Sequence, residues 1–428
     1  MKYRKYNNLA FAENCEIRNI QNKMLQEHLQ LLMRSSQFYK KHLKNSNITD
    51  ITIDNLHTLP TTSKKDIENH NSDFLICDKD DIAEIVRSSG TSGKPTKIVY
   101  TQNDIKRLKY NEHQALTHCE ISRSDTVLLT CTMDRCFIAG LAYFLGSHSI
   151  GATVIRNGAN TIESHLELIR DLKPNVIIGV PSFLLKLAKF AGKSTDPTAL
   201  GIEKLVCIGE PLRLWKDGRL KTTELCSKIE KLWEAKAFST YASTEMVTAF
   251  CECRKQEGGH LIPELAIVEI LDESGTPLPP GETGEVTITP FHFEAMPLLR
   301  YRTGDMATII ADKCECGRNS LRISGISGRK YQMIKCKGTT FYPTAVNAVL
   351  DGMDCVIEYQ LRVKNSNLSD SVSLAIALTE SAKFAEVETA LQTALRVKIE
   401  IQEEDIATLT KKVFPPGARK PKRVVINN

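Results

Sequence analysis

A loop rich in glycine and hydroxyl side chains lies between two short apolar runs, Ile85–Arg87 and Lys97–Tyr100. Its residues are Ser88, Ser89, Gly90, Thr91, Ser92, Gly93, Lys94 and Pro95. Glycines let backbone amides approach a ligand closely, hydroxyls donate hydrogen bonds, and a lysine adds positive charge. These residue types together suit the binding of a polyphosphate, although a flexible Ser/Gly linker would have a similar composition.

The spacing of this loop differs from that of a Walker loop. A Walker loop has the pattern G-x-x-x-x-G-K-[ST] and opens a helix. Here Gly93 and Lys94 are followed by Pro95 and then by a run that is typical of a strand. We therefore expect a phosphate loop that joins two strands.

A second group of residues is suited to hold a metal ion. The chain has 13 cysteines, and two C-x-C pairs, Cys251/Cys253 and Cys314/Cys316, stand on either side of His260. Zinc takes four thiolate or imidazole ligands in a tetrahedron, and Cys253, His260, Cys314 and Cys316 would supply them. Cys251 competes with Cys253 for one position. A closed site of this kind would be structural; free thiols and a surface histidine are the alternative.

Several segments occur in the same order as the motifs of one enzyme superfamily. They are Ser88–Pro95, Tyr241–Glu245, Tyr301–Asp305, and Gly328-Arg329 followed by Lys337-Gly338 and Pro343. The sequence resembles the adenylate-forming superfamily of acyl-CoA ligases and carrier-protein adenylation domains. The short chain, Ile208–Pro211 and the Cys-x-Cys-Gly segment before the last motif indicate its phenylacetate–CoA ligase branch.

The resemblance implies roles for individual residues. The phosphate loop would bind ATP together with Gly209, Glu210, Pro211, Tyr241 and Thr244. Asp305 would hold the ribose, because one carboxylate can accept hydrogen bonds from two neighbouring hydroxyls. Glu245 would be a ligand of Mg²⁺, which prefers hard oxygen ligands, and Arg329 would contact phosphate or ribose. Without the resemblance, Glu245 would be an acidic residue at a helix N-terminus and Asp305 a turn residue.

The C-terminal run from Pro415 to Val424 resembles the final lysine motif of the superfamily with several residues missing. Aligned backward from Arg423, Lys420 is the expected catalytic lysine, with Lys422 as the second choice. A cation beside the α-phosphate would stabilise the charge that develops when a carboxylate oxygen attacks. A solvated basic tail is the alternative.

Two segments depart from the pattern of the superfamily. Related ligases line the acyl pocket with aromatic and glycine residues, where this chain has Asp134, Arg135 and Cys136. The charged pair would be a surface contact or would recognise a polar group on the substrate. At the hinge between the domains, Tyr331 takes the place of the usual aspartate.

Strand-like and helix-like patterns alternate around these motifs. Apolar runs at 126–132, 175–180 and 204–208 are separated by helical patterns at 162–172 and 182–191. Such alternation predicts parallel strands with helical crossovers, and ligands bind beyond the carboxyl ends of such strands. We predict an α/β fold with a large N-terminal domain of parallel and mixed sheets, residues 1–328. A small α+β lid domain, residues 329–428, would follow it.

Composition narrows the class of protein. The chain has 428 residues, 42% of them hydrophobic, and a formal net charge of +5. No apolar run reaches the roughly 18 residues that span a bilayer, and the N-terminus lacks the features of a signal peptide. The basic run Lys411–Arg423 has a single aromatic residue, Phe414, and so lacks the repeated aromatic residues of a nucleic-acid patch. We expect a cytoplasmic protein, either monomer or homodimer, that binds neither membrane nor nucleic acid.

The expected reaction has two halves. A carboxylic acid, aryl or small acyl, attacks the α-phosphorus of Mg-ATP and gives an acyl-adenylate and pyrophosphate. The small domain then rotates, and a thiol, expected to be that of CoA, displaces AMP. One alternative replaces CoA by a carrier-protein thiol, an amine or a hydroxyl. The other is a non-catalytic, zinc-stabilised nucleotide-binding protein.

Overall fold

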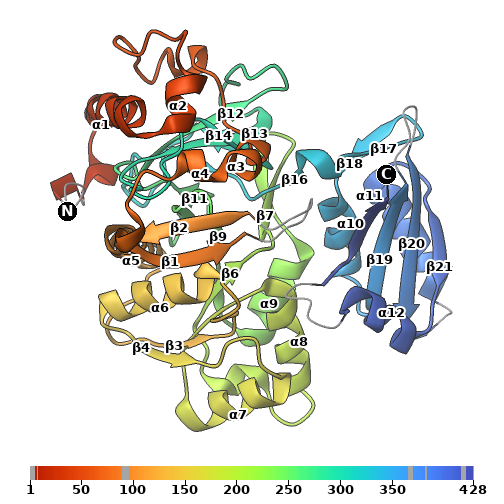
Figure 1. Ribbon diagram of the computed structural model, residues 1–428. Coiled ribbons are helices and arrows are strands. Elements are labelled where there is room, and N and C mark those ends of the chain that lie inside the picture. Colours follow the sequence, from red (N-terminus) through yellow and green to blue (C-terminus); the bar gives the residue numbers. More distant parts are fainter. Residues whose placement is uncertain are drawn as a thin grey trace.

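The computed structural model of the chain describes residues 5, 6, 8–88, 96–364, 370–380, 383–415 and 421–427. A larger α/β part lies beside a smaller α+β part, which the C-terminal residues form (Figure 1). The predicted fold class is therefore confirmed. The proposed domain boundary between residues 328 and 329 falls inside β16 (Gly328–Arg329), which still pairs with a strand of the larger part.

One sheet, with 12 strands, runs through the larger part. Neighbouring strands in one half are parallel, in the order β4-β3-β5-β6-β9. Their bounds are β3 Thr126–Leu129, β4 Thr153–Arg156, β5 Val176–Gly179, β6 Lys204–Ile208 and β9 Lys236–Ala242. The other half is antiparallel. It contains β10 Ala249–Glu252, β11 Gly259–His260, β12 Ala266–Leu271, β13 Thr283–Pro290, β14 Tyr301–Ile310, β15 Arg322–Ile323 and β16.

Helices cover both faces of the parallel strands, because successive strand residues point to opposite sides. Val127 and Leu129 pack with α5 and α6, whereas Leu128 packs with α7, α8 and α9. The bounds of these helices are α5 Gln102–His118, α6 Ile138–Ile150, α7 Ile162–Leu172, α8 Pro181–Ala191 and α9 Glu224–Trp233. This is the arrangement that the alternation of strands and helices predicts.

N-terminal helices cover the antiparallel half of the sheet. Residues such as Leu25, Leu29 and Phe74 pack in one core with strands β12 to β14. These helices are α1 Asn14–Ser35, α2 Gln37–His42, α3 Lys64–Asn69 and α4 Asn71–Phe74. Two further antiparallel pairs complete the larger part: β1 Ile82–Arg87 with β2 Lys97–Thr101, and β7 Arg213–Lys216 with β8 Arg219–Thr222. The strands predicted on either side of the phosphate loop are thus confirmed.

The smaller part is a four-stranded sheet in the order β21-β20-β19-β22, preceded by a hairpin of β17 and β18. Its strands are β17 Ile334–Cys336, β18 Thr339–Phe341, β19 Val356–Lys364, β20 Ser371–Leu378, β21 Glu400–Glu403 and β22 Val424–Asn427. Helices α10 Pro343–Leu350 and α11 Phe384–Leu395 share one core with this sheet. Helix α12 Ile406–Val413 packs on Ala375 and Ala377 of the other face. The C-terminal residues 424–427 therefore form an edge strand of this sheet.

Among the described residues, no helix combines the length and the apolar character that crossing a bilayer requires.

Candidate active site

The carboxyl ends of neighbouring parallel strands bring two predicted segments to one edge of the sheet. Strand β6 ends at Ile208 and leads into Gly209–Pro211, and β9 contains Tyr241 and leads into Thr244 and Glu245. Gly209 has a φ of 78°, which favours glycine and lets the chain turn at the end of the strand. Both segments therefore lie where ligands bind in sheets of this kind, as predicted.

Glu210 is held at this edge by the neighbouring strand–helix connection. It accepts hydrogen bonds from the Ser182 amide at 2.9 Å and from the Ser182 hydroxyl at 2.8 Å. Burial, followed by the charge of Asp351, raises the pKa of Glu210 above its ordinary value. Ser182 is the second residue of α8, the helix after β5, so the connections after β5 and β6 converge on this carboxyl group.

Asp305, Arg329 and Tyr241 form one hydrogen-bonded group. Asp305 on β14 lies opposite Arg329 on β16. The Arg329 Nε donates to Asp305 Oδ1 at 3.0 Å, and the Tyr241 hydroxyl donates to Asp305 Oδ2 at 2.9 Å. Burial, and then the charge of Asp305, raises the pKa of Tyr241 well above its ordinary value, so the phenol is a neutral donor. Three motifs that are distant in the sequence thus meet at one carboxylate.

Arg329 makes a further contact with the residue at the hinge position. Its Nη1 donates to the Tyr331 hydroxyl at 2.5 Å. The Tyr331 side chain is 46% exposed and its ring lies against Gly304, since a Cβ on that glycine would be 3.8 Å from ring atoms. The tyrosine that replaces the usual hinge aspartate therefore packs beside Asp305.

Thr244 and Glu245 are buried and lie beside β2, the strand that follows the phosphate loop. The Tyr100 hydroxyl, on β2, donates to the Thr244 carbonyl at 3.0 Å. Burial raises the pKa values of Tyr100 and Tyr301 well above the ordinary value, and the charge of Glu245 raises both further. The Glu245 carboxylate consequently lies close to both phenols. It sits in a turn and not at a helix N-terminus, so that alternative is wrong.

The described base of the phosphate loop is closed by two hydrogen bonds between Ser88 and Thr96. Ser88 is buried, its amide donates to the Thr96 carbonyl at 2.9 Å, and the Thr96 amide donates to the Ser88 hydroxyl at 3.3 Å. The Thr96 hydroxyl donates to Glu68 at 3.3 Å. Ser89, Gly90, Thr91, Ser92, Gly93 and Lys94 lie outside the described residues, as does Lys420. Their roles stay predictions.

Asp134 and Arg135 form only a loose pair. The Arg135 Nε lies 3.9 Å from Asp134 Oδ1, and both side chains are exposed. The Cys136 carbonyl accepts a hydrogen bond from the Arg87 amide at 2.9 Å, so this loop lies beside the start of the phosphate loop. The exposure of both side chains agrees with a surface ion pair, which contributes little to stability. The position of Asp134 and Arg135 beside the phosphate loop agrees with recognition of a polar group on the substrate.

A buried arginine that no sequence motif marks also supports this site. Arg107 on α5 is fully buried and donates to the carbonyls of Phe291 at 2.6 Å, Leu265 at 2.9 Å and Val247. Val247 follows Glu245 and has a φ of 51°, which is an unusual conformation for a β-branched residue. Arg107 thus holds the backbone that follows the Thr244–Glu245 segment.

The predicted metal ligands come together in the antiparallel half of the sheet. Cys253, His260, Cys314 and Cys316 present ligand atoms that all lie within 4.8 Å of one another. The Cys253 and Cys314 sulfurs are 3.6 Å apart, and the Cys316 sulfur lies 3.4 Å from His260 Nε2. Ligand atoms around a tetrahedral zinc are roughly 3.5–4 Å apart, so this group has the size and chemistry of a zinc site.

The state of the imidazole agrees with metal binding. The Ser320 hydroxyl lies 3.3 Å from His260 Nδ1, which leaves Nε2 facing the sulfurs. Burial lowers the pKa of His260 to about 3, so the ring is neutral, the form that binds metals. The competing residue, Cys251, is not part of the group, because its sulfur lies against the Thr240 hydroxyl. None of the 13 cysteines forms a disulfide.

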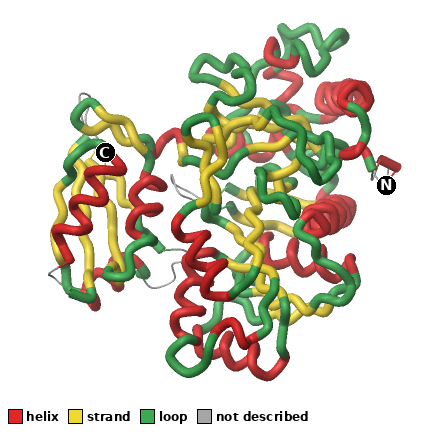
Figure 2. Tube along the Cα trace, turned by 180° about the vertical axis from the view of Figure 1, so that it is seen from behind, coloured by secondary structure: helices red, strands yellow, loops and turns green. Residues whose placement is uncertain are grey.

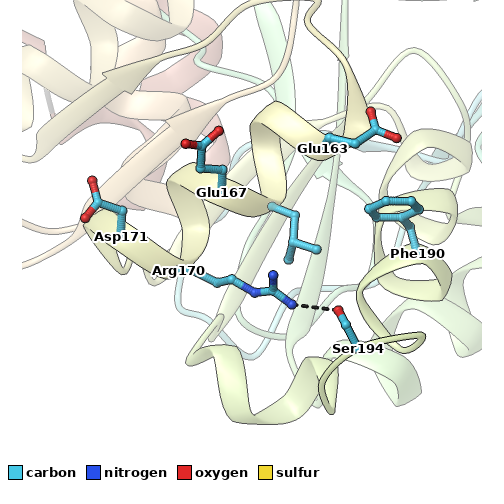
Figure 3. Close-up of a pocket in the computed structure, with 7 residues that line it drawn as sticks. Glu163, Glu167, Arg170, Asp171, Phe190 and Ser194 are labelled. Atoms are coloured by element: carbon cyan, nitrogen blue, oxygen red, sulfur yellow. Dashed lines mark hydrogen bonds between the residues drawn. The ribbon is translucent and has the colours of Figure 1, made fainter.

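A separate groove between α7 and α8 does not belong to this site (Figure 3). Apolar Leu166 and Phe190 line it together with charged residues of α7, and Arg170 donates to the Ser194 hydroxyl at 2.7 Å. None of the predicted site residues lines this groove.

Comparison with known proteins agrees with this geometry. The family of AMP-binding enzymes matches residues 21–290, so the chain belongs to that family, and the resemblance seen in the motifs is confirmed. A phenylacetate-coenzyme A ligase of Thermus thermophilus is 29% identical over 425 residues, which cover 94% of this chain and 93% of the relative.

Solved structures show the same fold. A 2-hydroxyisobutyryl-CoA ligase in the postadenylation state, in complex with R3-HIB-AMP, matches with a TM-score of 0.82 at 19% identity, covering 97% of this chain and 90% of its own. The same ligase with 2-HIB-AMP and CoA in the thioesterification state matches with a TM-score of 0.70 at 20% identity over the same shares.

Proposed function

We propose that this protein activates a carboxylic acid with ATP to an acyl-adenylate, releases pyrophosphate, and then transfers the acyl group to CoA. The observation that carries the proposal is the convergence of Tyr241 and Arg329 on the Asp305 carboxylate, beside the strand edge that holds Glu210 and Glu245. Membership of the AMP-binding family and the likeness to a phenylacetate-coenzyme A ligase over 94% of the chain support it.

In the proposed complex, Asp305 binds the ribose. Asp305 Oδ1 accepts a hydrogen bond from Arg329 and Oδ2 accepts one from Tyr241, and an ionised carboxylate has about four lone-pair sites in all. The two existing bonds fix the carboxylate before the nucleotide arrives, so little reorganisation is needed on binding. The phosphate loop, from Ser88 to Lys94, would then hold the phosphates next to Glu245.

Charge neutralisation supplies most of the proposed catalysis. Mg²⁺ held by Glu245 would neutralise phosphate charge when bound. Lys420 would place a further cation beside the α-phosphate as the acid attacks, with Lys422 as the second choice. Arg329 would stabilise charge on phosphate or ribose. The remaining rate acceleration would come from holding the acid and ATP in a reactive orientation, so no nucleophilic side chain is required.

A structural zinc ion is part of the proposal. Cys253 and His260 belong to the β10–β11 segment, whereas Cys314 and Cys316 belong to the loop after β14. Zinc bound by these residues would join two segments that neighbour the site strands. The ion would have four protein ligands and no open position, which is the pattern of a structural and not of a catalytic zinc.

The experiment that tests the function is acid-dependent exchange of labelled pyrophosphate into ATP with a panel of aryl and small aliphatic acids. We expect exchange with at least one acid, and thioester formation when CoA is added. If the acyl group is transferred to a carrier protein or an amine and not to CoA, the proposed acceptor is wrong. Absence of exchange with every acid would favour a non-catalytic nucleotide-binding protein. We place the protein in the cytoplasm, where ATP and CoA are available.

A further inference from the structure

Lysines of the larger part face acidic residues of the smaller part. Lys189 on α8 and Lys228 on α9 both reach the same oxygen of Asp354, at 3.0 and 2.9 Å. Lys186 on α8 lies 3.5 Å from Glu358 Oε2. We call these five residues the ion-pair interface. Figures 1 and 2 show α8 and α9 on the side of the larger part that faces the smaller part.

The Gly352 backbone also lies close to a side chain of α9 at this interface. A Cβ added to Gly352 would lie 2.6 Å from Glu224 Cγ and 3.0 Å from Glu224 Cβ, so a larger residue would displace the Glu224 side chain. Lys228 donates a further hydrogen bond to the Gly352 carbonyl. The ammonium of Lys186 lies 5.4 Å from the centre of the Phe414 ring. The facing surfaces of the larger and smaller parts therefore complement each other in both shape and charge.

This interface is continuous with the candidate active site. Glu358 accepts a hydrogen bond from Arg423 Nε at 3.0 Å, and Arg423 Nη1 donates to Asp351 at 3.0 Å. Arg423 directly precedes β22. The charge of Asp351 acts on Glu210, at the carboxyl end of β6. The interface thus fixes the face of the smaller part that is turned toward the strand edge of the site.

The larger and smaller parts of this chain are arranged more like those of the 2-hydroxyisobutyryl-CoA ligase in one of its states than in another. The TM-score is 0.82 for its postadenylation state and 0.70 for its thioesterification state, over 97% of this chain in both cases. This chain therefore has an arrangement closer to the first. Contacts between two parts that rotate relative to each other exist in one arrangement and are lost in the other.

We propose that Lys186, Lys189, Lys228, Asp354 and Glu358 are positioning residues that stabilise the arrangement used for adenylation and separate before thioester formation. The inference rests on the proposed two-step function. A single exposed ion pair contributes little, but Asp354 serves two lysines at once. An equilibrium between two arrangements of similar free energy responds to contacts of this size.

Charge reversal at Asp354 tests the proposal, because it removes two attractions and creates two repulsions. We expect Asp354→Lys to slow single-turnover adenylate formation about tenfold. Acyl transfer from preformed adenylate to CoA should be unchanged or faster. The matched control is Glu388→Lys, which breaks a 2.8 Å pair with Lys398 inside the smaller part and should leave both half-reactions unchanged. An equal loss in both half-reactions, or no loss, would overturn the proposal.

A charge swap separates the ion pairs from any general damage by the substitution. The variant Lys189→Glu/Lys228→Glu/Asp354→Lys restores attraction with opposite signs, and we expect it to recover adenylate formation. Small-angle scattering of the ligand-free full chain gives a readout that does not depend on activity. The radius of gyration should rise in Asp354→Lys and return in the swap variant; equal radii would reject the inference. A wild-type chain that makes neither adenylate nor thioester would reject only the proposed function.

Discussion

The Tyr241 hydroxyl donates a hydrogen bond to Asp305 Oδ2 at 2.9 Å, although the two residues are 64 positions apart in the sequence. This bond joins the parallel half of the sheet, through β9, to the antiparallel half, through β14. With Arg329 on the other oxygen, the carboxylate has a fixed orientation before any nucleotide binds.

Removal of the Tyr241 hydroxyl should weaken ATP binding. Tyr241→Phe keeps the ring but removes one hydrogen bond to Asp305 Oδ2, and a hydrogen bond to a charged group contributes about 1.5–3 kcal/mol. We expect the KM for ATP to rise roughly tenfold or more, with a smaller change in kcat. Tyr110→Phe is the matched control, because the Tyr110 hydroxyl donates to the buried Glu264 at 2.6 Å. If the KM for ATP rises equally in both variants, the effect does not depend on the hydrogen bond between Tyr241 and Asp305.

The metal prediction distinguishes two neighbouring cysteines. The folded chain should contain about one zinc ion, as a closed site with four ligands requires. Cys314→Ser should lose the metal and lower the melting temperature, whereas Cys251→Ser should keep the metal. Elemental analysis of the purified proteins measures both. Metal-free but fully folded wild-type protein would show that the four residues are free thiols and an unliganded histidine. Zinc retained in Cys314→Ser would show that Cys314 is not a ligand.

The choice between Cys251 and Cys253 illustrates what spacing alone leaves open. A C-x-C pair in a strand places both side chains on the same face. Strand β10 ends at Glu252, so Cys253 leaves the strand and joins His260, whereas Cys251 stays in the strand against Thr240. The end of a strand depends on its neighbours in the sheet, and the sequence does not contain that information locally.

Other parts of the site follow from the sequence to different degrees. Alternating strands and helices place Glu210 and Glu245 at one sheet edge, because parallel strands all end on the same side. The partners of Arg107 are backbone carbonyls up to 184 positions away, and no pattern marks such contacts. The strand Val424–Asn427 escaped prediction because it follows a basic run, yet Arg423 is buried against Glu358 and Asp351.

The lysine assignment yields a separate prediction. Lys420→Ala should abolish adenylate formation and spare ATP binding, because the lysine is proposed to act on charge that develops during the attack. Lys422→Ala, two residues away, should keep most of the activity. Rapid-quench measurement of acyl-adenylate checks the first result, and equilibrium binding of ATP checks the second. The reverse pattern, with Lys422→Ala inactive, would move the role to Lys422.

An ion-pair group in the smaller part predicts a pH dependence of stability. Glu404 accepts hydrogen bonds from Arg362 at 2.7 Å and from Lys412 at 2.8 Å. These bonds lower the pKa of Glu404 from 4.5 to about 2. Because the pKa is lower in the folded chain, the stabilisation is fully present above pH 4.5 and is lost as the pH falls toward 2.

Glu404→Gln should therefore cost about 1–2 kcal/mol of unfolding free energy at pH 7, after allowance for partial exposure. The difference from the wild type should shrink as the pH falls below 4.5. Urea denaturation at several pH values measures this, with Glu388→Gln as the control at a more exposed pair. A difference that stays constant down to acid pH would show that the charge of Glu404 contributes nothing.

The proposed ATP site is tested most directly by a crystal structure of the chain soaked with ATP. We expect both ribose hydroxyls to bind the Asp305 carboxylate between Tyr241 and Arg329, and the phosphates to lie between Ser88–Lys94 and Glu245. A nucleotide bound at any other place on the chain would contradict this proposal.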